Sequence, residues 1–310
     1  MEIHGYIRYN PQMNFFTRRS FLNLIFFIVT ITVTVSCESR NDDDLVPAYI
    51  SIEEIVVTSN LSQGSPSSNI TDAWVYLDET LIGSFELPAT VPILAEGKRN
   101  ITIRPGIKLN GISNTRAAYP FYTEIKREVN LVKDSVVNIS GLTTYEQNTT
   151  FPWIEDFELS SITLDTTSTS TVGLGRTNDA DLIFHEPGNS YSGIITMTND
   201  SSVFEAATID KFDFPANGGY VFLEVNYKIN HPLVAGVFYS INGARVQRPM
   251  VILNKTDEWN KIYINLSVIK YDTPTASDFQ VFFGAEKEDG TEDAVFLLDN
   301  IKLVRFNSSK

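Results

Sequence analysis

Short segments with β-strand character, separated by turn residues, follow one another from about residue 46 to the end of the chain. Residues 49–58 are rich in Ile and Val, residues 73–77 read Ala-Trp-Val-Tyr-Leu, and residues 100–104 alternate polar with apolar side chains. Gly, Pro, Ser or Asn bounds each segment, and no stretch sustains a helical period. This pattern predicts antiparallel strands packed in sandwiches, and hence an all-β protein.

The N-terminal segment has a different pattern and is excluded from the fold. Arg18 and Arg19 precede an apolar run over 21–35, which is 15 residues long. A transmembrane helix needs about 20 such residues. A basic start followed by a short apolar run is typical of a signal peptide, which we expect over residues 1–36. Met13 begins a more typical signal of the same kind, so it is an alternative start.

The only cysteine of the chain, Cys37, directly follows this run after Thr34-Val35-Ser36. The arrangement resembles the bacterial lipoprotein signal, in which the cysteine is lipidated and the chain is cut before it; Thr34 departs from the usual Leu. The resemblance implies a membrane partner held through a lipid anchor, because acyl chains hold a protein without a transmembrane helix. An uncleaved anchor with a free cysteine, and an ordinary secretory peptide, are the alternatives.

Residues 37–45 continue as a polar acidic tether that includes Asp42, Asp43 and Asp44. It has no apolar periodicity, so we expect a solvated spacer. Lipoproteins of the Bacteroidota often carry acidic residues at this place as a signal for display on the outer face of the outer membrane. The resemblance implies lipid anchoring in the outer membrane, facing the cell exterior, with a periplasm-facing anchor as the alternative.

Charge and composition exclude several classes of function. The 310 residues are 43% hydrophobic, which is ample for a packed core. The formal charge is -14, and from Cys37 onward 21 basic side chains face 37 acidic ones, because residues 1–36 contain three Arg and one Glu. A nucleic-acid partner is therefore excluded. One cysteine rules out a disulfide framework, and three histidines leave little for zinc or histidine-based catalysis.

A small β-sandwich domain is expected over residues 46–141. Within it, residues 72–78, 81–83 and 96–103 read as strand, hairpin, strand and Gly-turned strand. The unit resembles PEGA-type and carboxypeptidase-regulatory-type sandwiches, and the resemblance implies a spacer or interaction module. Residues 116–122, Arg-Ala-Ala-Tyr-Pro-Phe-Tyr, form an aromatic loop. We expect it to plug one end of the sandwich, with partner binding as the alternative.

A linker is expected over residues 142–152, followed by a second domain over 153–306 and a tail over 307–310. The number and spacing of the strand candidates suit a jelly roll, in which Val221, Leu223 and Val225 would face the core. The strand candidates are residues 182–184, 191–196, 219–227, 234–240, 261–266, 279–284 and 295–304.

The ends of the second domain carry a further resemblance. Residues 155–158 open it, residues 257–261 precede a late strand, and residues 296–303 close it. This is similar to the carbohydrate-binding-module and galactose-binding-like jelly rolls. The resemblance implies a structural calcium ion held by Glu158 and Asp299, since Ca²⁺ prefers oxygen ligands. A hydrogen-bonded carboxylate at a strand end explains the same residues without a metal.

Sugar binding would require aromatic rings presented flat toward a groove or loop rim, with nearby amides and carboxylates to hydrogen-bond hydroxyls. The candidates are Tyr191, which follows the turn at 186–190, and Arg245 and Arg248 beside Asn242-Gly243. Trp259 is a fourth candidate. It follows two acidic residues at the entrance to a strand, where aromatic rings usually cover the edge of the core, so a structural role competes with binding.

The motifs of common enzymes are missing. The sequence has no His-Glu-x-x-His, no Gly-x-Ser-x-Gly and no phosphate-binding loop, so no catalytic residue is assigned. A carboxylate-based glycoside hydrolase is a minor alternative. The sequence therefore predicts an envelope-anchored binding protein with no cofactor beyond a calcium ion, whose jelly roll engages a glycan or glycoconjugate. A non-catalytic subunit of an outer-membrane protein complex is the main alternative.

Overall fold

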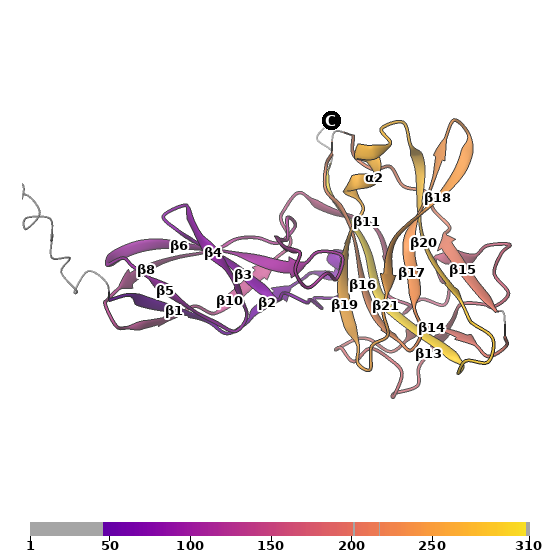
Figure 1. Cartoon of the computed structure of the whole chain (residues 1–310), viewed down its shortest axis with the longest axis horizontal. Helices are drawn as coiled ribbons and strands as arrows, with labels where there is room; N and C mark the ends of the chain where they lie inside the picture. The colour runs from indigo at the N-terminus through magenta and orange to yellow at the C-terminus, as the bar shows by residue number, and fades with distance from the viewer. Residues whose placement is uncertain (1–45, 201, 217, 308–310) are drawn as a thin grey trace, which may run out of the picture. The chain divides into compact units, whose positions relative to one another are not determined.

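The structure is a computed structural model that describes residues 46–200, 202–216 and 218–307 (Figure 1). The signal peptide, Cys37 and the acidic tether lie outside the described residues. From Pro47 onward the chain forms one compact unit. The predicted all-β fold is confirmed, because the helices in this part are the short η3 (Leu61–Gln63) and α2 (Ser267–Asp272). No helix in the described part is long and apolar enough to cross a bilayer.

The first sandwich consists of two layers. One layer contains β4 (Thr80–Glu86), β3 (Asp72–Leu77), β6 (Gly97–Lys108) and β7 (Arg116–Ala118), with β8 (Ile125–Leu131) also paired to β6. The other contains β5 (Ala89–Ile93), β1 (Ala48–Ile52) and β9 (Val136–Asn138), beside the pair β2 (Ile55–Thr58) and β10 (Gly141–Thr144). Ile50, Val75, Val91 and Ile103 are fully buried in its core.

The pairing in this sandwich differs from the all-antiparallel expectation in two places. Strand β9 pairs with β1 in parallel, and β10 pairs with β2 in parallel. The expected single strand at 49–58 is divided at Glu53 and Glu54, which are exposed and leave the sheet. Residues 136–144 run beside both halves in the same direction, which is why the parallel pairs come in succession.

The jelly roll has two larger sheets (Figure 1). The first contains β13 (Gly175–Thr177), β14 (Ser192–Met197), β21 (Ala294–Phe306), β16 (Val221–Ile229) and β19 (Asn260–Asn265), with β11 (Thr149–Glu155) also paired to β21. The second contains β12 (Leu164–Thr166), β15 (Val203–Thr208), β20 (Ser277–Glu286), β17 (Leu233–Ile241) and β18 (Ala244–Leu253).

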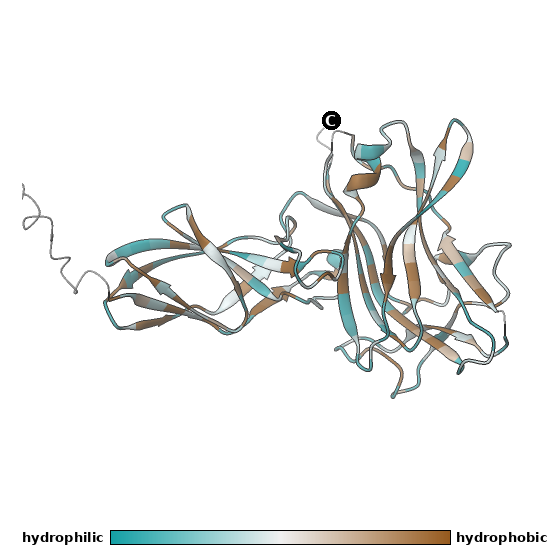
Figure 2. Cartoon of the chain, viewed as in Figure 1, coloured by the Kyte–Doolittle hydropathy of each residue, from teal (hydrophilic) through white to brown (hydrophobic). Residues whose placement is uncertain are grey.

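Alternating side chains of both sheets meet in the jelly-roll core. Val221, Leu223 and Val225 on β16 all lie in it, as the period of two predicts. Phe279, Val281 and Phe283 on β20 face the same core from the second sheet. Hydrophobic residues recur along the strands of both sandwiches in Figure 2.

Three local expectations were wrong. Residues 182–184 form no strand, because the backbone N–H groups of Leu182 and Ile183 both donate to the Asp179 carbonyl and make a turn. The strands β11, β12, β13, β15 and β18 lie outside the strand candidates. The proposed linker at 142–152 is structured at both ends, since β10 pairs with β2 and β11 pairs with β21.

Candidate functional site

Residues 116–118 of the expected aromatic loop form β7, and the rings of Tyr119, Phe121 and Tyr122 that follow lie between the first sandwich and the outer side of the first jelly-roll sheet. Tyr119 and Phe121 are 2% and 0% exposed. The Tyr119 ring centroid lies 5.3 Å from that of Phe222 and 4.8 Å from that of Tyr263. Such edge-on and tilted ring pairs add stability beyond their buried area. The loop therefore plugs the sandwich, as expected, and does so against the jelly roll of the same chain.

A buried charged cluster accompanies these rings. Glu224 on β16 is fully buried, accepts hydrogen bonds from the hydroxyls of Tyr119 and Tyr145, and lies 2.9 Å from the Lys261 ammonium. Burial raises the pKa of Glu224, but the charges of Lys261 and Lys302 outweigh it and lower the pKa overall. The Glu224 carboxylate is therefore ionised. Because it is buried away from solvent, its role is structural.

The outer face of the second jelly-roll sheet carries a separate group of apolar side chains. Side chains of that sheet alternate between the core and this outer face. Phe238, Ala207 and Phe282 form a small cluster on it, separate from the main core. Arg245 and Gln247 on β18 are exposed above the cluster. The second sheet therefore presents an aromatic patch under polar side chains.

The two rings lie against each other and are covered from above. The Phe238 and Phe282 centroids are 4.7 Å apart, and the rings are 6% and 1% exposed. The Arg245 guanidinium lies over the Phe238 ring, 3.8 Å from its centroid, in a cation–π contact. Gly236 lets the Phe282 ring lie directly on the backbone, since a Cβ there would come within 2.6 Å of that ring.

Hydrogen-bonding groups surround the covered rings. The Gln247 amide donates to Glu205 Oε2 at 2.8 Å, and the Thr167 hydroxyl donates to Glu205 Oε1 at 2.6 Å. A second amide, Gln280, accepts a long hydrogen bond from Arg245 at 3.5 Å. We call this surface the Phe238 face; it comprises Glu205, Phe238, Arg245, Gln247, Gln280 and Phe282.

The structure does not bring the four predicted ligand residues together. Arg245 lies on the Phe238 face, whereas Arg248 forms an ion pair with Asp272 of α2 at 2.6 Å. The Tyr191 ring packs on the core and is covered by Arg176, whose guanidinium lies 4.4 Å from its centroid. The Trp259 ring contacts Phe184 edge-on at 5.4 Å. Of the four, only Arg245 lies over an aromatic ring of the second sheet, that of Phe238.

Glu158 and Asp299, the predicted calcium ligands, hold opposite sides of the segment 189–192. Glu158 Oε1 accepts the backbone N–H groups of Ser190 and Tyr191 at 2.7 and 2.8 Å. Asp299 Oδ2 accepts from the Ser192 hydroxyl and from Asn189 Nδ2. Burial raises the pKa of Asp299 to about 7, against the lowering effect of these hydrogen bonds.

Hydrogen-bond donors engage both carboxylates. A cation requires oxygen lone pairs, and Asp299 is met by donors. Asn189 Nδ2 also donates to the carbonyls of Phe184 and Tyr191, so its amide oxygen cannot replace the nitrogen beside Asp299. Among residues 46–200, 202–216 and 218–307, no three His, Cys, Asp or Glu side chains gather as a metal site. The hydrogen-bonded alternative explains both residues.

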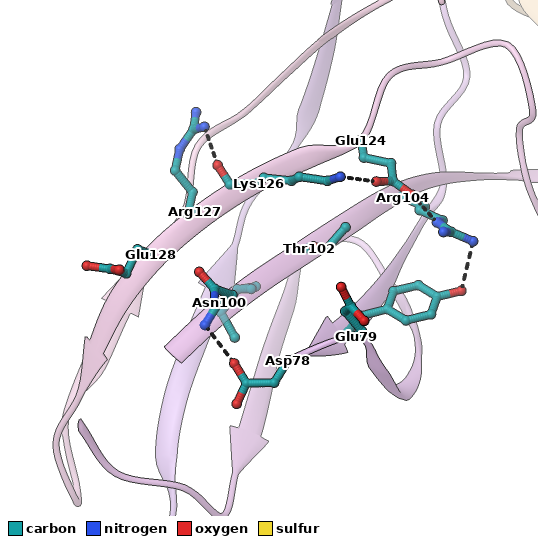
Figure 3. Close-up of a pocket in the computed structure, with 11 residues that line it drawn as sticks. Asp78, Glu79, Asn100, Thr102, Arg104, Glu124, Lys126, Arg127 and Glu128 are labelled. Atoms are coloured by element: carbon teal, nitrogen blue, oxygen red, sulfur yellow. Dashed lines mark hydrogen bonds and ion pairs between the residues drawn. The ribbon is translucent and has the colours of Figure 1, made fainter. Parts of the chain in front are cut away.

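A second polar surface lies on the first sandwich and was not expected from the sequence. Residues of β3, β6 and β8 line an open groove of about 700 Å³ (Figure 3). The Arg104 guanidinium covers the Tyr76 ring at 4.7 Å, and Glu124 pairs with both Arg104 and Lys126. These charges satisfy one another at the surface. The signal for it was the period-two placement of Glu124, just before β8, and of Lys126 and Glu128 on that strand.

Comparisons with known proteins give structural likenesses of low similarity. No protein-family model matches the chain, and no curated protein matches it. The Clostridium thermocellum xylanase 10B CBM22-1–GH10 structure with xylohexaose is 14% identical, with a TM-score of 0.37, over 51% of this chain and 28% of that chain. TmCBM61 with β-1,4-galactotriose is 15% identical, with a TM-score of 0.30, over 46% and 86%.

The family 11 carbohydrate-binding module of Clostridium thermocellum, in complex with a mixed-linked tetrasaccharide, is 13% identical. Its TM-score is 0.32, and the match covers 48% of this chain and 92% of that chain. This chain thus spans about a quarter of the xylanase chain and most of the two separate modules. What those proteins bind is a property of those proteins.

Proposed function

We propose that this chain is a non-catalytic, envelope-anchored binding protein that engages a glycan or glycoconjugate through the Phe238 face of its jelly roll. The observation that carries the proposal is the Arg245 guanidinium, placed over the Phe238 ring on the outer face of the second sheet, in a cluster separate from the main core. Carbohydrate sites combine an apolar surface for the sugar ring with a few polar groups that fix orientation. This face has both.

Binding requires one local movement. Phe238 is 6% exposed because Arg245 covers it, so a sugar ring can reach the aromatic ring once the guanidinium has moved aside. Arg245 is exposed, and its one polar contact, to Gln280, is 3.5 Å long, so little holds it in place. After moving, the guanidinium can donate to sugar hydroxyls together with the Gln247 amide.

Location belongs to the proposal as well. Lipidation of Cys37 would hold the protein on the outer membrane, facing the cell exterior, with the acidic tether as spacer. Metabolic labelling with a clickable palmitate analogue, in wild type and Cys37→Ala, followed by protease shaving of intact cells, tests it. Label that is lost in the variant, with wild-type protein removed by shaving, is expected. Absence of label overturns the anchor, and labelled protein that resists shaving overturns surface display.

A glycan array probed with the fragment that starts at Asp44 tests the binding site. Arg245→Ala and Gln247→Ala are expected to lose binding, whereas Arg248→Ala, on the same strand but paired with Asp272, is expected to retain it. Equal binding by all variants places the site elsewhere, and a blank array overturns glycan binding. Release of new reducing ends from a bound glycan would show that the protein hydrolyses it, and would overturn the proposal that the protein is non-catalytic.

A structural role is the second candidate, and the buried contact around Tyr119 favours it. Rings of the first sandwich and of the jelly roll interdigitate there around an ionised Glu224, so the two act as one unit. A subunit that docks onto an outer-membrane complex would need such a unit. A blank array, together with an envelope protein recovered by crosslinking at the Phe238 face, would favour this role over glycan binding.

A further inference from the structure

Three aliphatic side chains stand exposed at the end of the first sandwich where the chain enters it. Leu94, Val132 and Val136 are 66%, 53% and 56% exposed. Leucine and valine on a surface are ordinary when scattered, but a group at one place marks an interaction surface. We call these three residues the apolar pole.

Backbone pairing places the three residues beside Pro47. Ala48 is the register partner of Ile93, so Leu94 lies one residue beyond the paired end of β1. Val136 is the register partner of Tyr49, and the Asp134 N–H donates to the Pro47 carbonyl at 2.9 Å. Val132 directly follows β8, whose last residue, Leu131, pairs with Gly97. The pole is thus one end of the sandwich, built from the β5–β6 and β8–β9 connections and the first residue of β9.

The charge of this end differs from that of the chain. Residues 94–98 and 131–136 carry two basic and two acidic side chains, and Lys133 lies 3.7 Å from Glu96. From Cys37 onward, by contrast, acidic side chains outnumber basic ones by 37 to 21. A surface of anionic lipid headgroups would repel most of the protein but not this neutral, apolar end.

The length of the tether limits the distance between the pole and the bilayer. Nine residues, 38–46, separate Cys37 from Pro47. At full extension, about 3.3–3.6 Å per residue, they reach on the order of 35 Å, and a flexible chain spans much less. We infer that the apolar pole rests on the lipid bilayer, in the headgroup region, and orients the sandwich on the membrane. This inference rests on the proposed lipidation of Cys37.

Nitroxide labels at single added cysteines test the contact. When Cys37 is lipidated, no other thiol competes for the label. Leu94→Cys and Val132→Cys report on the pole. Leu142→Cys is the matched control, because Leu142 is 60% exposed on β10, opposite Val56 and well along the same sandwich, and Ile252→Cys on β18 is a second control. The full lipidated protein is reconstituted in vesicles of phosphatidylcholine and phosphatidylglycerol.

Collision of each label with oxygen, which concentrates in lipid, and with a water-soluble nickel chelate gives its depth. We expect the Leu94 and Val132 labels to show several-fold less nickel collision, and more oxygen collision, than the Leu142 and Ile252 labels. Equal nickel collision at all four sites overturns the inference. This result is expected if the apolar pole binds a partner protein and not the bilayer. Protein that fails to float with the vesicles shows instead that the anchor itself is wrong, and the inference fails with it.

Discussion

The Lys261 ammonium lies 2.9 Å from Glu224 Oε2, in a position where both side chains are at most 3% exposed. Lys302, also fully buried, adds a second positive charge whose field acts on the same carboxylate. Glu224 is therefore the acid that faces both lysines between the first sandwich and the jelly roll. Removing it would leave the Lys261 ammonium in a low-dielectric site without its counter-charge.

Glu224→Gln is accordingly expected to destabilise the protein by about 3–5 kcal/mol, the usual cost of breaking a buried ion pair. Urea unfolding of the fragment from Asp44 measures it. The control is Glu128→Gln, because the Lys98–Glu128 pair is exposed and such pairs contribute about 0–1 kcal/mol. A loss under 1 kcal/mol for Glu224→Gln would contradict the role given to this residue.

Lys302 gives the stability a dependence on alkaline pH. Burial lowers its pKa to about 7, although Glu224 opposes the shift. The unfolded chain, with a pKa near 10.5, binds more protons than the folded one between these values, so stability rises as pH rises from about 7 to about 10. The slope is at most about 1.4 kcal/mol per pH unit.

Lys302→Met is expected to flatten this rise, which urea midpoints between pH 7 and 10 would show. Above about pH 10 the buried tyrosines act in the opposite direction, because burial raises the pKa of Tyr119 and Tyr145 in the folded state. Lys228→Met, a half-buried lysine on β16, is the control and should keep the wild-type slope. An unchanged slope in Lys302→Met would show that Lys302 stays charged when folded.

Asp299 gives the stability of the protein a pH dependence between about pH 4 and 7. Burial raises its folded pKa to about 7 from 3.8, so the folded state binds more protons between these values. Its contribution to stability is complete below about pH 4 and is lost as pH rises through 7. Asp299→Asn, which keeps the shape, should flatten that limb in unfolding curves from pH 4 to 7. A steep limb that survives in Asp299→Asn would assign the dependence to another group.

The sequence predicted well what depends on alternation. Val221, Leu223 and Val225 lie in the core that their period of two required. The closing strand at 295–304 is part of β21. These elements are determined locally, because a run of alternating residues has one apolar face and that face must be buried.

The candidate site depended on contacts that no local pattern shows. The sequence places Arg245 beside a turn, but its ring partner, Phe238, lies on the other strand of the hairpin. Glu205 reaches Gln247 from β15, a strand that was not expected. Gly236 is informative only once Phe282 is known to lie on it. Such a site is formed when strands far apart in the sequence pair with one another. The sequence can therefore indicate one of its residues, but not which other residues lie beside it.

Removal of calcium is expected to leave the protein unchanged. Asp299 and Glu158 are satisfied by hydrogen-bond donors from residues 189–192 and 300, so no ion is required to balance them. The melting temperature of the fragment from Asp44 should be the same in calcium and in EGTA. A fall in EGTA that calcium restores would show that these carboxylates, or residues near them, hold the metal that the carbohydrate-binding-module resemblance implies.

Gly236 offers the sharpest check of the Phe238 face, because it couples stability to the arrangement of the two rings. A Cβ at this position would come within 2.6 Å of the Phe282 ring, and it would also clash with the Arg248 carbonyl of the neighbouring strand. Gly236→Ala therefore has to displace either the ring or β18, and we expect a loss of about 1–3 kcal/mol. The matched control is Gly284→Ala on β20, where the nearest atom to a new Cβ is 3.5 Å away. If urea unfolding shows equal, small losses for both variants, Phe282 does not pack on the backbone of β17, and the aromatic base of the proposed glycan site is absent.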